Sequence, residues 1–155
     1  MPRSAPLHPP RPVPPLGAGS VLAALMLATA TGSGLTALLF AGAALLFPSG
    51  GGIAMAVAGL PLFFFFACPI WLVGLTVLGG PCWWILHRSG VRSPWTAVLA
   101  GASLTLSVAG GYIALSPVPA DRGSIEAWIF VAGLTAIGAV TGRVLAKVAY
   151  QKGAQ

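Results

Sequence analysis

Residues 53–88 read IAMAVAGLPLFFFFACPIWLVGLTVLGGPCWWILHR, and this stretch decides the fold. Its first 34 residues carry no charge. As an α-helix they would extend about 51 Å, because a helix rises about 1.5 Å per residue. The hydrocarbon core of a bilayer is about 30 Å thick. The stretch can therefore cross a membrane, and it is too long to do so once as a straight helix.

Prolines indicate where this helix bends. Pro61, Pro69 and Pro81 lack the amide hydrogen, and a proline inside a helix removes a hydrogen bond and kinks the axis. Two interpretations stay open. Either the crossing spans residues 53–78 and breaks at the glycines before Pro81, or it spans residues 60–86 with Pro69 as a kink within the membrane.

The composition of the whole chain is that of a membrane protein. Of its 155 residues, 57% are hydrophobic and 6% are charged. Soluble domains carry about 25% charged residues to hydrate their surfaces. The net charge of +6 does not indicate a nucleic-acid partner, because the basic residues lie between or beyond the apolar runs. Abundant Ala, Gly and Pro, with more Arg than Lys, favour a bacterial source and hence the inner membrane.

Apolar runs separated by short loops predict four membrane spans, at about residues 19–47, 53–86, 94–115 and 125–144. The expected fold is an all-α, integral membrane four-helix bundle with a kinked second span. It occupies residues 19–150 and is followed by a short cytoplasmic tail at 151–155. The first two spans should be antiparallel neighbours, because the loop between them is too short for anything but a tight hairpin.

The N-terminal residues 1–18 are expected to form a disordered, proline-rich cytoplasmic tail. Residues 2–15 contain seven prolines, which prevent a helix. A signal peptide is the alternative, with an A-x-A sequence at Ala28–Ala30 as its cleavage site. We favour an uncleaved first span, because the apolar run continues for 17 residues beyond this site.

Two serines precede predicted helices and are candidate caps. Ser93 is followed by Pro94, which suits the first turn of the third span. Ser124 precedes the fourth span, where Glu126 would lie favourably in the first turn.

Basic residues predict the orientation. Seven lie on one side of the predicted topology: Arg3, Arg11, Arg88, Arg92, Arg143, Lys147 and Lys152. The other side carries Arg122 alone, beside Asp121. The positive-inside rule therefore predicts that both termini are cytoplasmic.

Aromatic and basic side chains at the ends of the spans are expected to anchor the protein at the membrane interface. These residues are Trp83, Trp84, His87, Arg88, Arg92, Trp95, Arg143 and Lys147. His87 and Arg88 follow the paired tryptophans at a spacing of four, which favours stacking or cation–π contacts on a helix. A lipid-headgroup or partner contact is the alternative interpretation.

Small residues at helical spacing predict close helix packing. Gly138 and Gly142 form a GxxxG step in the fourth span, and Gly101 belongs to a small-residue row in the third. Packing within the monomer is favoured over homodimerisation. Four consecutive phenylalanines at 63–66 point all around their helix, and we interpret them as bulk facing lipid and neighbouring helices.

The predicted spans contain no ionisable residue away from their ends. Catalysis or coupled transport within a membrane usually needs such a group. We therefore expect no enzyme, catalytic residue, cofactor or metal site. The leading hypothesis is a non-enzymatic accessory or assembly module whose partners are the lipid bilayer and either a second copy or another membrane protein. The alternative is a small transporter, channel or lipid-handling protein that uses the Pro/Gly-kinked second span.

Overall fold

The computed structural model describes residues 18–46, 52–90, 93–117 and 124–151. The helices in this part of the chain are α1 (Ala18–Leu46), α2 (Gly52–Gly74), the π-helix η1 (Leu75–Gly79), α3 (Gly80–Arg88), α4 (Pro94–Ala114) and α6 (Ile125–Gln151). The predicted N-terminal tail, apart from Ala18, and Arg92 lie outside the described residues. The all-helical prediction is confirmed for the described residues.

Within these residues, four helical segments are long and apolar enough to cross a membrane. They are Gly19–Leu46, Ala56–Leu86, Pro94–Ala114 and Ile125–Ala149. The shortest has 21 residues, which corresponds to about 31 Å of helix and matches a bilayer core of about 30 Å.

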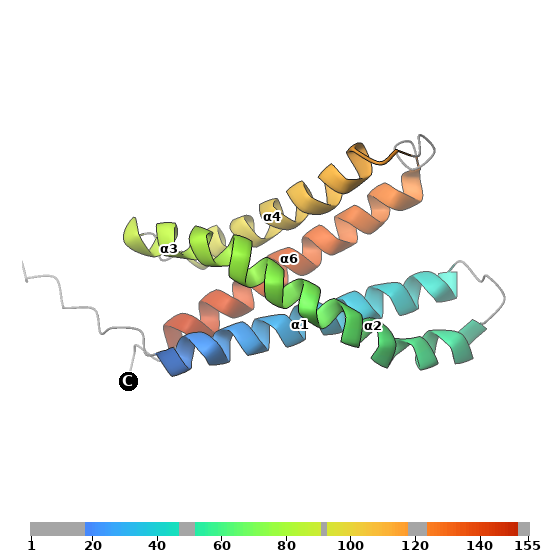
Figure 1. The fold of residues 1–155 in the computed structure, drawn as a ribbon, viewed down its shortest axis with the longest axis horizontal. Helices are drawn as coiled ribbons and strands as arrows, with labels where there is room; N and C mark the ends of the chain where they lie inside the picture. The colour runs from blue at the N-terminus through green and yellow to red at the C-terminus, as the bar shows by residue number, and fades with distance from the viewer. Residues whose placement is uncertain (1–17, 47–51, 91–92, 118–123, 152–155) are drawn as a thin grey trace, which may run out of the picture.

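The helices form two antiparallel pairs (Figure 1). α1 packs against α2, and α4 packs against α6. α1 also packs against α6, which joins the two pairs, while η1 contacts α4. The second span therefore begins beside α1 and, further along, reaches the third span.

The second span continues as helix from Gly52 to Arg88, so the interpretation in which it breaks before Pro81 is wrong. Instead, the hydrogen-bonding pattern changes to a π-helix in η1. Pro81 lacks the amide that would bond the carbonyl of Val77 in η1, so this carbonyl has no partner in the regular α-helical pattern. Pro61 and Pro69 lie inside α2, where the bends remain a prediction.

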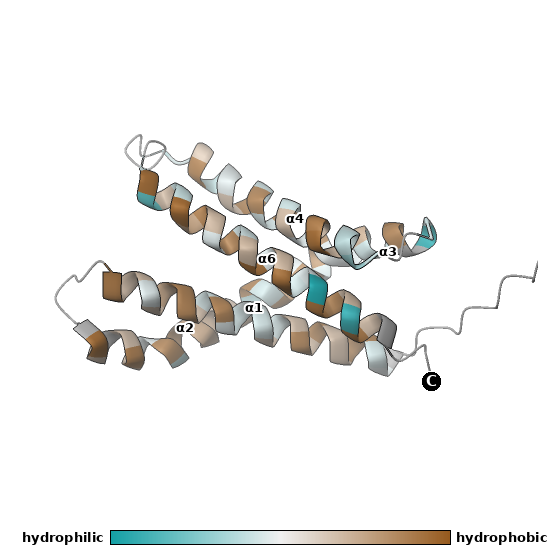
Figure 2. Cartoon of the chain, turned by 180° about the vertical axis from the view of Figure 1, so that it is seen from behind, coloured by the Kyte–Doolittle hydropathy of each residue, from teal (hydrophilic) through white to brown (hydrophobic). Residues whose placement is uncertain are grey.

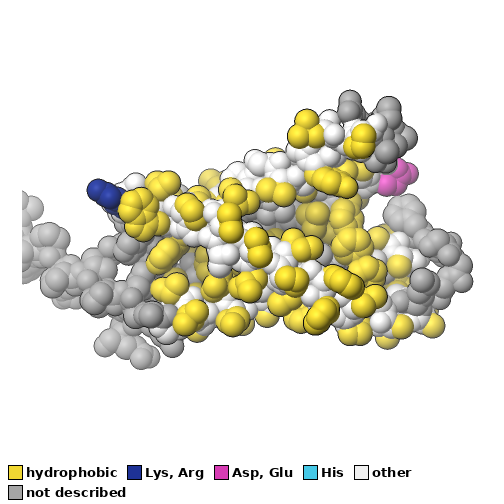
Figure 3. Space-filling model, viewed as in Figure 1, with side chains coloured by type: hydrophobic (Ala, Val, Ile, Leu, Met, Phe, Trp, Pro, Cys, Tyr) yellow, Lys and Arg dark blue, Asp and Glu magenta, His cyan; other side chains and the backbone are white. Residues whose placement is uncertain are grey.

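The interior of the bundle is built from small side chains. Among the described residues, the largest fully buried side chains are those of Thr141 and Ser33, and most of the buried apolar residues are alanines. Large apolar side chains instead cover the outside, among them Phe65, Tyr112 and Leu115 (Figure 3). This arrangement suits a lipid solvent, in which bulky apolar groups have no reason to be inside and small groups let helices approach.

The two predicted caps differ. The hydroxyl of Ser124 accepts a hydrogen bond from the Ala127 amide at 3.3 Å and donates to Oε2 of Glu126 at 2.5 Å. Ser93 occupies the cap position of α4 but makes no side-chain cap bond within the described structure. There its backbone carbonyl accepts from the amide and the hydroxyl of Thr96. The predicted helix start, with Ser93 at the cap position and Pro94 in the first turn, is confirmed, but the Ser93 hydroxyl does not supply the cap.

Hydrophilic residues gather at the ends of the bundle (Figure 2). The end of α3 and the C-terminal part of α6, with Arg88, Arg143 and Lys147, lie at one end, and Glu126 opens α6 at the other. The basic residues of the described helices therefore lie toward one end of the bundle, and the orientation in a membrane stays a prediction.

Candidate functional site: an apolar cavity between the second span and α4

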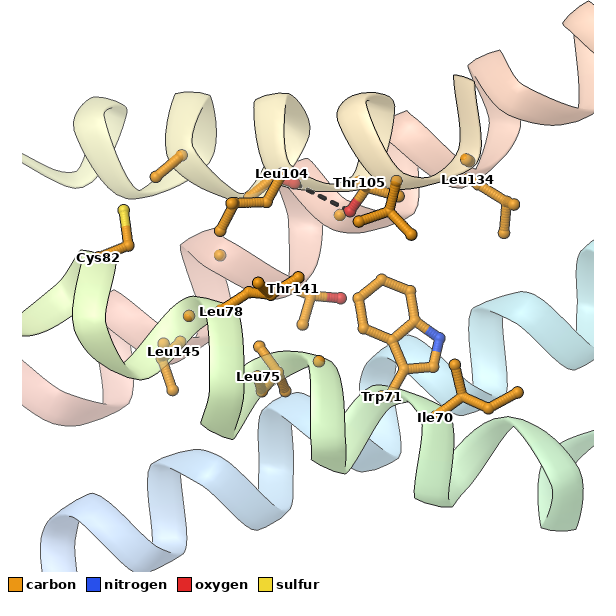
Figure 4. Close-up of a pocket in the computed structure, with 18 of the residues that line it drawn as sticks. Ile70, Trp71, Leu75, Leu78, Cys82, Leu104, Thr105, Leu134, Thr141 and Leu145 are labelled. Atoms are coloured by element: carbon orange, nitrogen blue, oxygen red, sulfur yellow. Dashed lines mark hydrogen bonds between the residues drawn. The ribbon is translucent and has the colours of Figure 1, made fainter. Parts of the chain in front are cut away.

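An apolar cavity of about 350 Å³ lies between the second span and the pair formed by α4 and α6 (Figure 4). Every described helix contributes to its wall. α1 contributes two residues, Thr36 and Phe40. The second span contributes, among others, Trp71, Leu75, Leu78 and Cys82, and α4 and α6 contribute Leu104, Thr105, Leu134, Thr141 and Leu145. No charged side chain of the described residues lines it.

Trp71 forms the wall of the cavity on the side of α1. Its Nε1 donates to the hydroxyl of Thr36 at 2.9 Å, and that hydroxyl donates to the carbonyl of Gly32 at 2.8 Å. A Cβ atom placed on Gly32 would lie 2.6 Å from Cδ2 and 2.9 Å from Cε2 of the indole. A point this close to both fusion atoms must lie above the ring rather than at its edge. Gly32 therefore covers one face of the indole, and the ring also lines the cavity.

Gly32 has a role in packing. Glycine weakens helices, yet α1 continues through Gly32-Ser33-Gly34. Ser33 is fully buried and donates to the carbonyl of Thr29 at 2.8 Å. Gly32 provides the space that the ring of Trp71 occupies.

Thr141 lies in the wall of the cavity and has an unusual polar atom. Its side chain is 1% exposed, and its hydroxyl has no hydrogen-bond partner among the described residues. Other helix hydroxyls, such as those of Thr36, Thr105 and Thr135, donate to the carbonyl four residues earlier at 2.8–2.9 Å. In Figure 4 the Thr141 hydroxyl points from α6 toward the side on which Trp71 lies.

The opposite wall of the cavity is held together by the predicted packing glycines. A Cβ atom on Gly138 would lie 2.7 Å from the carbonyl oxygen of Gly101 and closer still to the hydroxyl of Thr105. A Cβ atom on Gly142 would overlap the carbonyl oxygen of Ala97. The structure thus brings Gly101, Gly138 and Gly142 together at one helix crossing within the monomer, where only glycine fits.

Of the predicted anchor residues, Trp83, Trp84 and Arg88 belong to α3, Trp95 lies in the first turn of α4, and Arg143 and Lys147 lie in the last third of α6. The guanidinium of Arg88 lies 5.4 Å from the ring centre of Trp84, which is a cation–π contact. Trp84 and Trp95 are 57% and 71% exposed, and the side chains of Arg143 and Lys147 are exposed as well. Trp83 is partly buried and lines the cavity. The side chain of His87 lies outside what the structure describes.

The phenylalanine run divides between the two environments. Phe63 stacks on Phe40 of α1 with ring centres 4.9 Å apart, and Phe40 also meets Phe130 of α6 edge-on at 4.8 Å. Phe64, Phe65 and Phe66 face outward. Phe40 therefore connects α2 with α6 next to the cavity.

Sequence reasoning missed the cavity and its two polar features. Trp71 lies in the middle of a long apolar run, and Thr141 lies inside the GxxxG step, where it reads as one more small residue. A tryptophan at the centre of a span, far from the interfaces that tryptophan prefers, is the signal that could have indicated it.

Comparison with known proteins returned no match, whether against family models, curated proteins or solved structures. The class of protein therefore comes from the fold. Four described segments suited to crossing a bilayer, with large apolar side chains outward and small ones inward, indicate a multi-pass membrane protein.

Proposed function

We propose that this protein is a non-enzymatic, lipid-handling membrane protein that binds a lipophilic small molecule between its second span and α4. The observation that carries the proposal is the apolar cavity of about 350 Å³ at that position. Ligand pockets in proteins range from about 300 to 1,000 Å³ and are mostly apolar with few polar groups.

The position of the cavity indicates where an occupant would come from. Because the cavity lies between helices suited to crossing a membrane, molecules dissolved in the bilayer are the natural source of an occupant.

Filling the cavity tests the proposal. Gly74 lines it, and a Cβ atom on Gly74 would meet no described atom within 4 Å, so Gly74→Leu has room for its side chain. We expect Gly74→Leu to fold and to lose at least half of the lipophilic material that copurifies with wild type in mild detergent. Mass spectrometry of organic extracts measures this material.

Gly42→Leu is the matched control. A Cβ atom on Gly42 also meets no described atom within 4 Å, but Gly42 is not among the cavity residues. It should copurify as much lipophilic material as wild type. Equal amounts from all three proteins would contradict the proposal.

Association with another membrane protein is the second candidate function. The small-residue face of α6 offers little support, because it is used against α4. The observation that favours association is a shallow depression on the outer side of α1 and α2, lined in part by Ala30, Gly34 and Pro61. Crosslinking through a cysteine at Ala30 in native membranes would reveal a partner there, and a monomer that captures no protein would remove this candidate.

We further propose that the protein resides in a bacterial inner membrane with both termini in the cytoplasm. The support is the end of the bundle that carries Arg88, Arg143 and Lys147. A reporter fused after Gln155 that is active only in the cytoplasm should be active, and one that is active only in the periplasm should be silent. The reverse pattern would overturn the orientation.

A further inference from the structure

Two features of the cavity restrict its ligand more narrowly than the apolar wall does. The inference drawn from them rests on the proposed function. Thr141 offers a buried hydroxyl without a partner, and Trp71 offers one face of a fixed indole. Buried polar groups are normally hydrogen-bonded, so the hydroxyl of Thr141 is an available donor. A flat aromatic surface favours an offset stack with another planar ring.

The volume fits one ring with substituents. An apolar cavity of about 150 Å³ is enough to hold benzene. The present cavity, at about 350 Å³, has room for a substituted six-membered ring and the first part of a tail. The lining contains no charged side chain of the described residues, which disfavours a ligand with a charged head.

Two classes of lipid carry a carbonyl that can accept a hydrogen bond from Thr141. They are phospholipids, through their ester groups, and neutral ring compounds that bear a carbonyl. Of the two, only a planar ring can also stack on the indole of Trp71.

We propose that the cavity binds a quinone-type lipid, a neutral planar ring that bears carbonyl groups and an apolar tail. The ring stacks on the indole of Trp71, and one carbonyl accepts a hydrogen bond from Oγ1 of Thr141. The tail leaves between α4 and the second span toward the bilayer.

Thr141→Val tests the hydrogen bond, because it replaces the hydroxyl by a methyl group of similar size. The probes are a benzoquinone with a ten-carbon alkyl tail and the matching alkylbenzene, which has no carbonyl. Binding to the full chain in lipid nanodiscs is measured by titration. We expect Thr141→Val to weaken binding of the quinone roughly three- to tenfold, which is the usual contribution of one hydrogen bond, and to leave binding of the alkylbenzene unchanged.

Two further variants separate this result from a structural effect. Thr29 has a hydroxyl that is likewise buried and without a partner, but it does not line the cavity. Thr29→Val should therefore bind the quinone as wild type does. Thr141→Ser keeps the hydroxyl and should restore most of the affinity.

The outcomes distinguish this inference from the proposed function. If the quinone and the alkylbenzene bind equally well to wild type and to Thr141→Val, and Gly74→Leu abolishes both, the cavity binds lipophilic molecules without selecting a carbonyl. The inference is then wrong and the proposed function stands. If wild type and Gly74→Leu bind both probes equally, the proposed function fails as well. Native extracts that contain only phospholipid would also overturn the inference.

Discussion

The contact between α4 and α6 differs from the contact between α4 and the second span in how closely the helices approach. Where α4 meets α6, Gly101, Gly138 and Gly142 bring backbone against backbone, and no Cβ atom would fit. Where α4 faces the second span, Trp71, Leu75 and Leu78 stand between the helices and a cavity remains. Helix α4 therefore makes a close contact with α6, here called the sealed contact, and an open contact with the second span, where the cavity remains.

The difference shows that the small-residue row of α4 packs closely against only one neighbouring helix. The glycine face of α4 is used by α6, which allows close approach and strong van der Waals contact in a lipid solvent. The second span carries bulky residues on the side that faces α4, and its π-helix lies at the point of contact. Bulky side chains hold the helix axes apart, and their irregular shapes leave space between them.

The largest expected effect comes from breaking the sealed contact. Gly138→Ala places a methyl group against the carbonyl of Gly101 and the hydroxyl of Thr105, so α4 must move away. We expect a loss of about 1–3 kcal/mol in unfolding free energy, as for overpacked interiors. Denaturation by SDS in mixed micelles, followed by circular dichroism, measures the loss.

Gly42→Ala is the control for Gly138→Ala, and its effect should have the opposite sign. A Cβ atom at Gly42 meets no described atom within 4 Å, so replacing glycine in the helix interior should stabilise by about 0.5–1 kcal/mol. The interpretation of a sealed contact fails if both variants change stability equally.

A smaller effect is expected at the edge of the open region. Trp71→Phe removes the hydrogen bond from Nε1 to Thr36 and keeps most of the ring. We expect a loss of about 0.6 kcal/mol, the average for a hydrogen bond between membrane helices, and no more than about 1.7 kcal/mol. Trp95→Phe, at a residue that is 71% exposed, should leave the unfolding free energy unchanged. A loss of the same size at both positions would mean that the indole of Trp71 has no special role.

The smallest effect lies outside both contacts, at the end of α3. The cation–π contact between Arg88 and Trp84 is exposed, so its coupling should be about 0.5 kcal/mol. A double-mutant cycle with Arg88→Gln and Trp84→Leu isolates this coupling in unfolding free energies. Additive effects of the two substitutions would show that the contact contributes nothing to stability.

Several features could be predicted from the sequence because their causes are local. The lengths of the apolar runs predicted the four segments suited to spanning a bilayer. Ser124 and Glu126 predicted the start of α6. The four-residue spacing of Trp84 and Arg88 was enough to predict their contact. The GxxxG step marked a face for close packing, although nothing in the spacing named its partner.

The cavity could not be predicted because it depends on groups from different helices. The roles of Gly32 and Trp71 become visible only when α1 lies beside α2, since residues 39 positions apart share no local pattern. Thr141 resembles any other small residue of α6 until its hydroxyl is found without a partner beside an apolar space.

The amino-acid sequence by itself determined the solvent of this protein, because the hydropathy of each segment fixes whether water or lipid can surround it. It also determined the four described segments suited to crossing the bilayer. The tertiary structure decided which helices meet closely and which leave a space. That choice depends on whether small or bulky side chains face one another across a contact, and only the packed arrangement brings them together.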